Sequence, residues 1–196
     1  MRIKIAQVGE AVLRQRARQL GVDEIRSRET QQLIEWMRET MHDAPGVGLA
    51  APQVGLGLQL AIIEDKPEYL KDMPAAAVKE RERKAVPFHV IVNPKLTLQG
   101  PSDVEFFEGC LSLAGFTAVV PRVRHVKVEC LDHNGKSKVI EASGWYARIL
   151  QHEIDHLQGT VYIDRMYSRS FMSTENYGRH WKDKAIREVR DGLRLE

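Results

Sequence analysis

Two histidines and a glutamate near residue 150 form the pattern in this sequence that most clearly suggests chemistry. His152 and His156 are four residues apart, and Glu153 directly follows the first. In an α-helix, residues four apart share one face, so both imidazoles would point the same way. Two such rings can bind one metal ion while the carboxylate reaches a water on it. The alternative is two unrelated histidines and a solvated glutamate, and a third ligand elsewhere would decide between them.

A cysteine in the middle of the chain is the candidate third ligand. Cys110 stands in the run Glu-Gly-Cys-Leu-Ser, and its thiolate would leave a fourth tetrahedral position for water. This donor set suits zinc, iron(II), nickel or cobalt, and does not suit magnesium or calcium. Gly109 would let a substrate backbone pass close by, and the N–H of Leu111 could donate to an oxyanion. The alternatives for Cys110 are a buried thiol and a nucleophile paired with a histidine.

A glycine-rich segment is the third candidate piece of a site. Gly46 and Gly48 begin the run Gly-Val-Gly-Leu-Ala-Ala-Pro, which Gln53 ends with a neutral amide donor. The glycines permit close approaches that other residues do not. A phosphate loop is a weak interpretation, because no Gly-Lys-Ser/Thr follows and Pro52 breaks the helix that such a loop would open. A plain turn between a helix and a strand is the alternative.

Length and composition narrow the class of protein. The 196 residues suffice for one domain, and 43% hydrophobic with 29% charged residues is ordinary for a globular protein. The net charge of +2 is too small to indicate nucleic-acid binding. No apolar run has the length of a membrane span, no secretory leader is visible, and two cysteines are too few for a disulfide framework. We expect a cytoplasmic protein in a reducing compartment, or an organellar one whose presequence was removed.

Apolar spacing at helical period predicts the helices, at residues 24–41, 143–159 and 183–193. Ser143 is a good N-cap for the middle helix, and Gly159 a good residue to end it. The last helix lies in a polar tail that begins near residue 168. Residues 66–87 are charged and contain three prolines. They predict an exposed insertion with a helical turn or two. We expect it to be a solvated surface segment rather than a binding element.

Short apolar or alternating runs predict strands at residues 3–5, 58–63, 90–98, 104–113, 126–130, 138–141 and 160–163. Gly100-Pro101 indicates a turn, and Asn134-Gly135 indicates a two-residue hairpin. Cys130 lies on the apolar face of its strand and is expected in the core. The pattern predicts an α+β fold: one domain over residues 1–196, with antiparallel β-sheets packed around the central motif-bearing helix.

The three motifs together resemble those of a known family. Gly-x-Gly-Leu-Ala-Ala-x-Gln, Glu-Gly-Cys-Leu-Ser and Gln-His-Glu-x-Asp-His are similar, in this order, to the signature motifs of peptide deformylase. The likeness extends over residues 46–166. The run Ala-Ser-Gly-Trp, the insertion after Glu64 and the pair Gly115-Phe116 are most like the subgroup from plant and animal organelles. Pro52 departs from the threonine or serine often found there, and the tail beyond the motifs is assigned no role.

The resemblance implies a hydrolase of protein biosynthesis and N-terminal processing. Such enzymes remove the formyl group from the N-terminal formyl-methionine of newly made polypeptides and release formate. Metal-bound hydroxide attacks the formyl carbon, with Glu153 as general acid and base. The amide of Gln53 and the N–H of Leu111 would stabilise the oxyanion. Fe(II) is the usual ion, with zinc, nickel or cobalt as alternatives. The implied metal ligands are Cys110, His152 and His156.

The resemblance also implies an apolar pocket for the methionine side chain. Its positions in this sequence are Val47, Phe106, Trp145, Arg148 and Ile149. Arg148 is expected at the rim through its aliphatic stem, and Gly48 and Gly109 would contact the extended peptide backbone. Asp155 is expected to pair with Arg122 and so fix the helix.

The implied partners are N-formylmethionyl peptides, which the protein would meet as nascent chains at the ribosome. The sequence shows no motif for direct nucleic-acid binding, and no membrane attachment is expected. A homodimer is possible. One rival is a zinc endopeptidase, which shares H-E-x-x-H. In that class the third metal ligand is commonly a glutamate or histidine downstream of the motif. Downstream of Gly159, this sequence offers only His180 and scattered acidic residues. The second rival is a ribosome-associated binding module with a structural metal, which the presence of every catalytic position disfavours.

Overall fold

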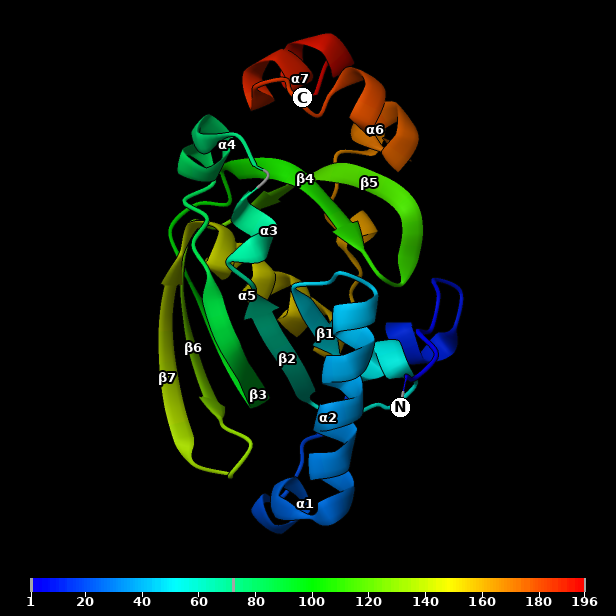
Figure 1. Cartoon of the computed structure of the whole chain (residues 1–196), viewed down its shortest axis with the longest axis vertical. Coiled ribbons are helices and arrows are strands. Elements are labelled where there is room, and N and C mark those ends of the chain that lie inside the picture. Colours follow the sequence, from blue (N-terminus) through cyan, green and yellow to red (C-terminus); the bar gives the residue numbers. More distant parts are fainter. Residues whose placement is uncertain (1, 72, 196) are drawn as a thin grey trace.

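The central helix, α5 (Gly144–Leu157), packs against the larger of two sheets (Figure 1). The structure is a computed structural model, and it describes residues 2–71 and 73–195 of the chain. The larger sheet has the strand order β1-β2-β3-β6-β7, and all its neighbouring strands are antiparallel. Its strands are β1 (Gly48–Ala50), β2 (Leu60–Asp65), β3 (Val86–Gln99), β6 (His125–Leu131) and β7 (Ser137–Ser143).

The smaller sheet has the order β4-β5-β8 and is also antiparallel. Its strands are β4 (Val104–Cys110), β5 (Leu113–Arg122) and β8 (Met172–Ser173). The strand expected over residues 104–113 ends at Cys110, because the chain turns there, and Leu113, which pairs with Cys110, begins β5. This turn places Cys110 at the end of a hairpin.

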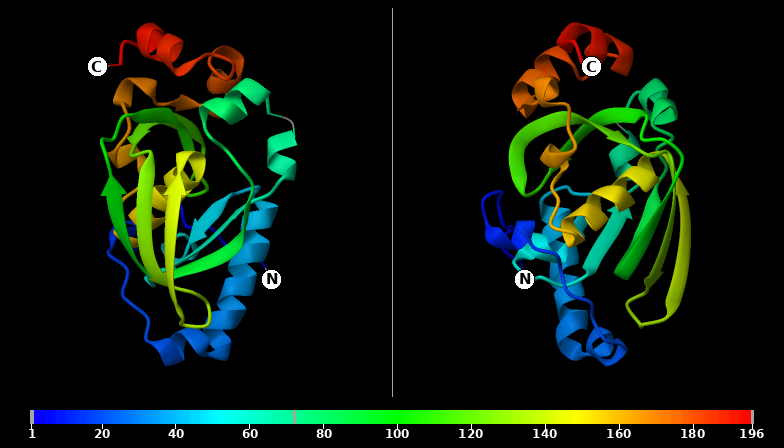
Figure 2. Two further views of the ribbon diagram at one scale, coloured as in Figure 1. Left: turned by 90° about the vertical axis from the view of Figure 1, so that its left-hand side faces the viewer. Right: turned by 180° about the vertical axis from the view of Figure 1, so that it is seen from behind.

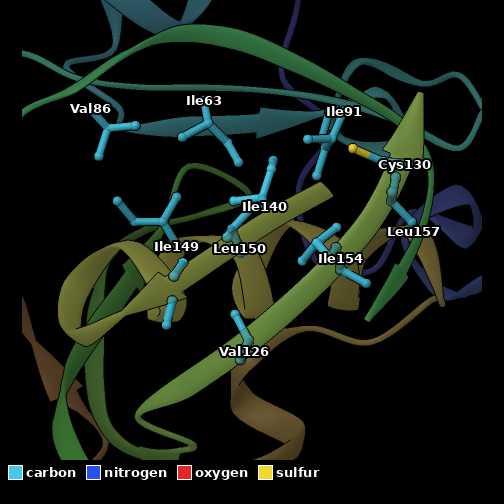
Figure 3. Packing of buried hydrophobic residues seen from close by; sticks show 14 of the residues in the cluster. Ile63, Val86, Ile91, Val126, Cys130, Ile140, Ile149, Leu150, Ile154 and Leu157 are labelled. Atoms are coloured by element: carbon cyan, nitrogen blue, oxygen red, sulfur yellow. The ribbon is translucent and has the colours of Figure 1, made fainter. Parts of the chain in front are cut away.

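The main apolar core fills the space between α5 and the larger sheet (Figure 3). Ile149, Leu150, Ile154 and Leu157 supply the helix side. The last three of these are four and three residues apart, as a helical face requires. Cys130 is 7% exposed in this core, as expected from the alternation of its strand. The face of α5 that carries these residues is what anchors its two histidines.

The described residues form six further helices around this core: α1 (Val22–Arg26), α2 (Arg28–Asp43), α3 (Glu68–Lys71), α4 (Ala75–Glu80), α6 (Thr174–His180) and α7 (Ile186–Leu193). Short 3-10 turns are η1 (Ala11–Arg14), η2 (Ala51–Val54), η3 (Tyr162–Asp164) and η4 (Ser168–Ser170). In a second apolar cluster, α2 packs with β1, β2 and β3. Figure 2 shows α6 and α7 at one end of the molecule and α1 at the other.

Two predicted strands are wrong, because local side chains and distant segments satisfy their backbone groups. No strand forms at residues 3–5: the N–H of Ile3 donates to Thr40 Oγ1 at 2.9 Å, and that of Ala6 donates to the Gln53 carbonyl at 2.8 Å. Residues 160–163 enter η3, where the N–H of Val161 donates to Asp164 Oδ2 at 2.8 Å. Each of these bonds replaces a ladder partner.

The helix expected over residues 24–41 is two helices. Ser27 is extended, with φ −61° and ψ 152°, and its side chain accepts from the N–H of Thr30, so it caps α2. The hairpin at Asn134-Gly135 is present with a longer loop than two residues. There Asp132 Oδ1 accepts from the N–H groups of Asn134 and Lys136, and Gly135 has φ +71°.

The insertion forms the two helical turns expected, α3 and α4. The C-terminal tail contains the peripheral helix α7 and a second helix, α6, which polar composition did not indicate. Val189 and Leu195 are 1% and 7% exposed, packed against Val119 of β5. None of the helices in the described residues is long and apolar enough to cross a membrane. The fold is α+β and a single domain, as expected.

Replacing Leu150 with alanine tests the main core. Leu150 is fully buried between α5 and the sheet, so we expect the free energy of unfolding to fall by about 2–5 kcal/mol. Urea denaturation measures this. Leu98→Ala is the matched control, because Leu98 is 53% exposed, and its effect should stay within about 0.5 kcal/mol. Equal losses in the two variants would contradict this description of the core.

Candidate metal centre and substrate cavity

The three predicted metal ligands come together, although one is far from the others in the sequence. The sulfur of Cys110 and the ring nitrogens of His152 and His156 all lie within 4.8 Å of one another. Cys110 Sγ is 3.3 Å from His156 Nε2. The hairpin end of β4 supplies the sulfur, and consecutive turns of α5 supply the nitrogens. One thiolate and two imidazoles are a donor set that could hold zinc or a similar transition-metal ion with a position left open.

Glu108 orients one of these ligands and was assigned no role from the sequence. Its Oε2 accepts from His152 Nδ1 at 2.9 Å, which leaves His152 Nε2 for an ion. Glu108 also accepts two hydrogen bonds from Arg122 and one from Arg148. Burial alone would raise the pKa of Glu108, but Arg122 and His152 hold it well below its usual value. The sequence did carry a signal for this role, because residues 108 and 110 are two apart in a predicted strand and so share one of its faces.

The side chain of Glu153 lies so close to the backbone of β1 that only a glycine fits at the point of contact. A Cβ at residue 48 would overlap the Glu153 carboxylate, so Gly48 makes room for it. Glu153 is 4% exposed, its Oε2 has no hydrogen-bond partner within the described residues, and burial raises the pKa of the carboxyl to about 7. A buried carboxyl of this kind, beside a cavity, is suited to exchanging protons.

Gln53 is held with its amide nitrogen against the cysteine. Its Oε1 accepts from the N–H of Ala50 at 2.9 Å, while its Nε2 lies 3.4 Å from Cys110 Sγ and 3.2 Å from Ser112 Oγ. The amide orientation is therefore set by the backbone of the glycine-rich segment. Leu111 follows Cys110, and its carbonyl accepts from Gln7 Nε2 at 3.1 Å.

The expected pair of Asp155 and Arg122 is present. Arg122 Nη1 donates to Asp155 Oδ2, and Arg165 donates to both oxygens of the same carboxylate at 2.7 Å. Arg122 thus joins Asp155 on α5 to Glu108 on β4. Arg165 is a second partner that the motif did not indicate.

These groups open onto a cavity of about 700 Å³, a size in the range of ligand sites. Most of the predicted site residues line it: Val47, Gly48, Gln53, Gly109, Cys110, Leu111, Trp145, Arg148, Ile149, His152 and Glu153. His156 lies behind them, 1% exposed. Other lining residues were not expected from the sequence: Ile5, Gln7, Arg83, Phe107, Phe116 and Thr174.

Two of the predicted pocket positions need correction. Phe106 does not line this cavity; its ring packs edge-on against Trp145, with the ring centroids 6.2 Å apart, and so forms a second layer behind it. Its neighbour Phe107 lines the cavity instead. Arg148 is not at the rim: it is 3% exposed, and its guanidinium donates to Glu108 and to the carbonyls of β4 and β5. An ion-pair partner in the interior explains why this arginine is buried.

The insertion at residues 66–87 is not only a solvated surface segment, as expected, but also contributes to the cavity. Arg83 lines the cavity, donates to both oxygens of the fully buried Asp65 at 2.8 Å, and lies 5.3 Å from the Trp145 ring. Arg81 lies 5.1 Å from the same ring. The insertion therefore supports the wall that Trp145 forms. Its charged composition concealed this role, because the buried partner, Asp65, belongs to β2.

Comparison with known proteins identifies the family. The family model for polypeptide deformylase matches residues 3–171. The chain belongs to the polypeptide deformylase family. The match includes all three motifs and confirms the resemblance seen in the sequence. It also leaves most of the C-terminal tail of this deformylase-family chain outside the common region.

The relatives include bacterial, plant organellar and human mitochondrial peptide deformylases. Chloroplastic peptide deformylase 1A of Solanum lycopersicum is 47% identical over 88% of this chain and 62% of its own length. Peptide deformylase 1 of Bifidobacterium longum is 44% identical, over 94% of this chain and 82% of its own. The chain thus spans slightly less than two thirds of the tomato relative. A class I type b peptide deformylase from Acinetobacter baumannii, solved with Met-Ala-Ser bound, is 30% identical with a TM-score of 0.74, covering 85% and 99% of the two chains.

Glu108→Gln tests the support of the metal ligands. The variant keeps the size of the side chain and loses the charge that orients His152, so we expect metal affinity to fall about 10- to 100-fold. Competition with a chromogenic chelator measures affinity without reference to activity. Glu129→Gln, on an exposed position of β6, is the control and should bind metal as the unaltered chain does. Unchanged affinity in Glu108→Gln would contradict this role.

Proposed function

We propose that this chain hydrolyses the N-terminal formyl group of formyl-methionyl peptides and releases formate. The observation that carries the proposal is the convergence of Cys110, His152 and His156 beside Glu153, at a cavity whose lining includes apolar side chains. Membership of the polypeptide deformylase family supports the same reaction. Nascent chains are the proposed substrates, in the cytoplasm or in an organelle.

The metal ligands in this proposal are the one sulfur and two nitrogens that converge. A thiolate with two imidazoles fits Fe(II), zinc, nickel or cobalt, and we propose Fe(II) as the native ion. When bound, the ion lowers the pKa of a water and polarises a carbonyl oxygen. Glu108 holds His152 so that only one of its ring nitrogens is free to coordinate.

Glu153 is the proposed proton carrier. It takes a proton from the water that attacks the formyl carbon, and it returns this proton to the amine that leaves. The Gln53 amide and the Leu111 N–H are proposed to stabilise the negative oxygen in between, and one such donor is typically worth about 3–4 kcal/mol. Because Gln53 Oε1 is tied to the Ala50 N–H, the amide nitrogen faces the cysteine before substrate arrives.

Apolar side chains in the lining of the cavity support recognition of methionine. Val47, Trp145 and Ile149 are apolar residues of its lining. The ring of Phe106 packs against Trp145, and the guanidinium of Arg148 lies 5.9 Å from the centre of the Trp145 ring. At Gly109 a Cβ would meet only the Phe116 carbonyl, at 3.6 Å, which leaves space for a peptide backbone. A backbone contact at Gly48 is also proposed.

Formate release from formyl-Met-Ala-Ser, with Fe(II) supplied anaerobically, tests the function. Glu153→Ala should lose activity at least about a hundredfold while keeping its metal, because this glutamate moves protons and is not among the three ligands. Cys110→Ser should lose both activity and metal, measured by elemental analysis. Full metal content and turnover in Cys110→Ser would refute the ligand assignment. Cleavage of internal bonds in casein without formate release would favour an endopeptidase.

Gly48→Ala tests the placement of Glu153. The added methyl group would displace the carboxylate, so we expect kcat for the formyl peptide to fall at least about tenfold, as expected when a catalytic group is misplaced. Bound metal should be unchanged. Gly57→Ala is the matched control, because a Cβ at residue 57 has nothing within 4 Å. Equal kcat values in the two variants would argue against this constraint.

A further inference from the structure

A buried hydroxyl group near the metal centre has no hydrogen-bond partner within the described residues. It belongs to Tyr162, which is 1% exposed. A buried tyrosine usually finds a partner for its hydroxyl, because burying a polar group without one is costly. A phenylalanine would fill the same surroundings without that cost. The hydroxyl group of Tyr162 therefore needs an explanation other than packing.

Tyr162 lies beside two of the three candidate metal ligands. Its ring is nearly parallel to the His152 ring, with centroids 6.3 Å apart and planes 19° from parallel. Cys110 packs against the apolar cluster that Tyr162 forms with Ala118 and Val120 of β5. Tyr162 is not among the residues that line the cavity. It therefore approaches the metal centre from within the protein rather than from the cavity.

The turn that carries Tyr162 is tied to the helix that supplies both histidines. The N–H of Val161 donates to Asp164 Oδ2 at 2.8 Å, which closes the turn η3. The carbonyl of Tyr162 accepts from the N–H of Arg165 at 3.0 Å. The guanidinium of Arg165 in turn donates to both oxygens of Asp155 on α5. These bonds set the place of the tyrosine ring relative to α5.

Two negatively charged groups lie near this hydroxyl, and one of them has acceptor capacity left. Burial raises the pKa of Tyr162, and the negative charges of Cys110 and Glu108 raise it further, so the hydroxyl is a donor. Each oxygen of Glu108 already accepts two hydrogen bonds. The Cys110 sulfur accepts from Gln53 Nε2 and from the N–H of Ser112, both at 3.4 Å. A thiolate sulfur can accept a further one, so the sulfur is the remaining acceptor.

We propose that Tyr162 is a positioning residue of the metal centre, whose hydroxyl donates to the sulfur of Cys110 through one bridging water. The proposal rests on the ligand assignment made in the proposed function. The hydroxyl forms no direct hydrogen bond to the sulfur, and a water commonly joins polar groups that are too far apart to bond directly. A donor to the sulfur draws electron density from the thiolate. The ion that this thiolate holds is then a stronger Lewis acid.

The spectrum of the Co(II)-loaded chain tests this link by a signal that packing alone does not move. A thiolate bound to Co(II) gives a sulfur-to-metal charge-transfer band in the near ultraviolet. Tyr162→Phe removes only the hydroxyl, so we expect this band to move to longer wavelength, because a thiolate that has lost a donor gives up electron density more readily. Competition with a chromogenic chelator should show metal affinity reduced about tenfold.

Tyr146→Phe is the matched control for this experiment. The same substitution there removes a hydroxyl that lies 2.9 Å from His89 Nε2, and Tyr146 does not line the cavity. Both the charge-transfer band and the metal affinity should equal those of the unaltered chain. In Tyr162→Phe, kcat for formyl-Met-Ala-Ser should fall about tenfold with KM unchanged, because the hydroxyl acts on the metal centre and not on substrate binding.

The spectrum also separates this proposal from the proposed function. A shifted band and weaker metal binding in Tyr162→Phe would support the role of the hydroxyl even if the unaltered chain released no formate. A band and an affinity equal to those of the unaltered chain would overturn it and leave the proposed function standing. An unaltered chain that binds Co(II) without any sulfur band would refute Cys110 as a ligand, and so overturn both.

Discussion

The buried carboxylate of Glu108 is the interaction on which the rest of this site depends. It accepts from Arg122, Arg148 and His152, and so joins β4 and β5 to α5. An ionised carboxylate in the interior is costly unless it is paired, and here each oxygen accepts two hydrogen bonds. Asp155 extends the network through Arg122 and Arg165. The smaller sheet and the helix are consequently held in one register, which keeps the cysteine opposite the histidines.

One face of α5 packs in the apolar core, and the other carries candidate site residues. One face buries Ile149, Leu150 and Ile154 against the larger sheet, as Figure 3 shows. The other presents His152 and Glu153 to the cavity. Because a helix is rigid over a few turns, packing on the first face sets positions on the second. The missing side chain at residue 48 lets β1 approach the helix closely enough to form the opposite wall.

The cavity is assembled from segments that are distant in the sequence. Ile5 and Gln7 come from the N-terminal segment, Arg83 from the insertion and Thr174 from the start of α6. None of them belongs to a signature motif. The signature motifs and the rest of the cavity lining are therefore supplied by different parts of the chain.

Local patterns in the sequence sufficed to locate the candidate metal ligands and most of the elements. Helical spacing indicated that His152 and His156 share a face, and alternation located the strand of Cys130, because these periods are properties of single segments. Long-range contacts decided the rest. The backbone near Ile3 bonds to α2 instead of to a strand. Arg148 is buried because it pairs with Glu108, and Phe106 packs against Trp145 and does not line the cavity. Burial and pairing depend on residues far away in the chain, so only the tertiary structure reveals them.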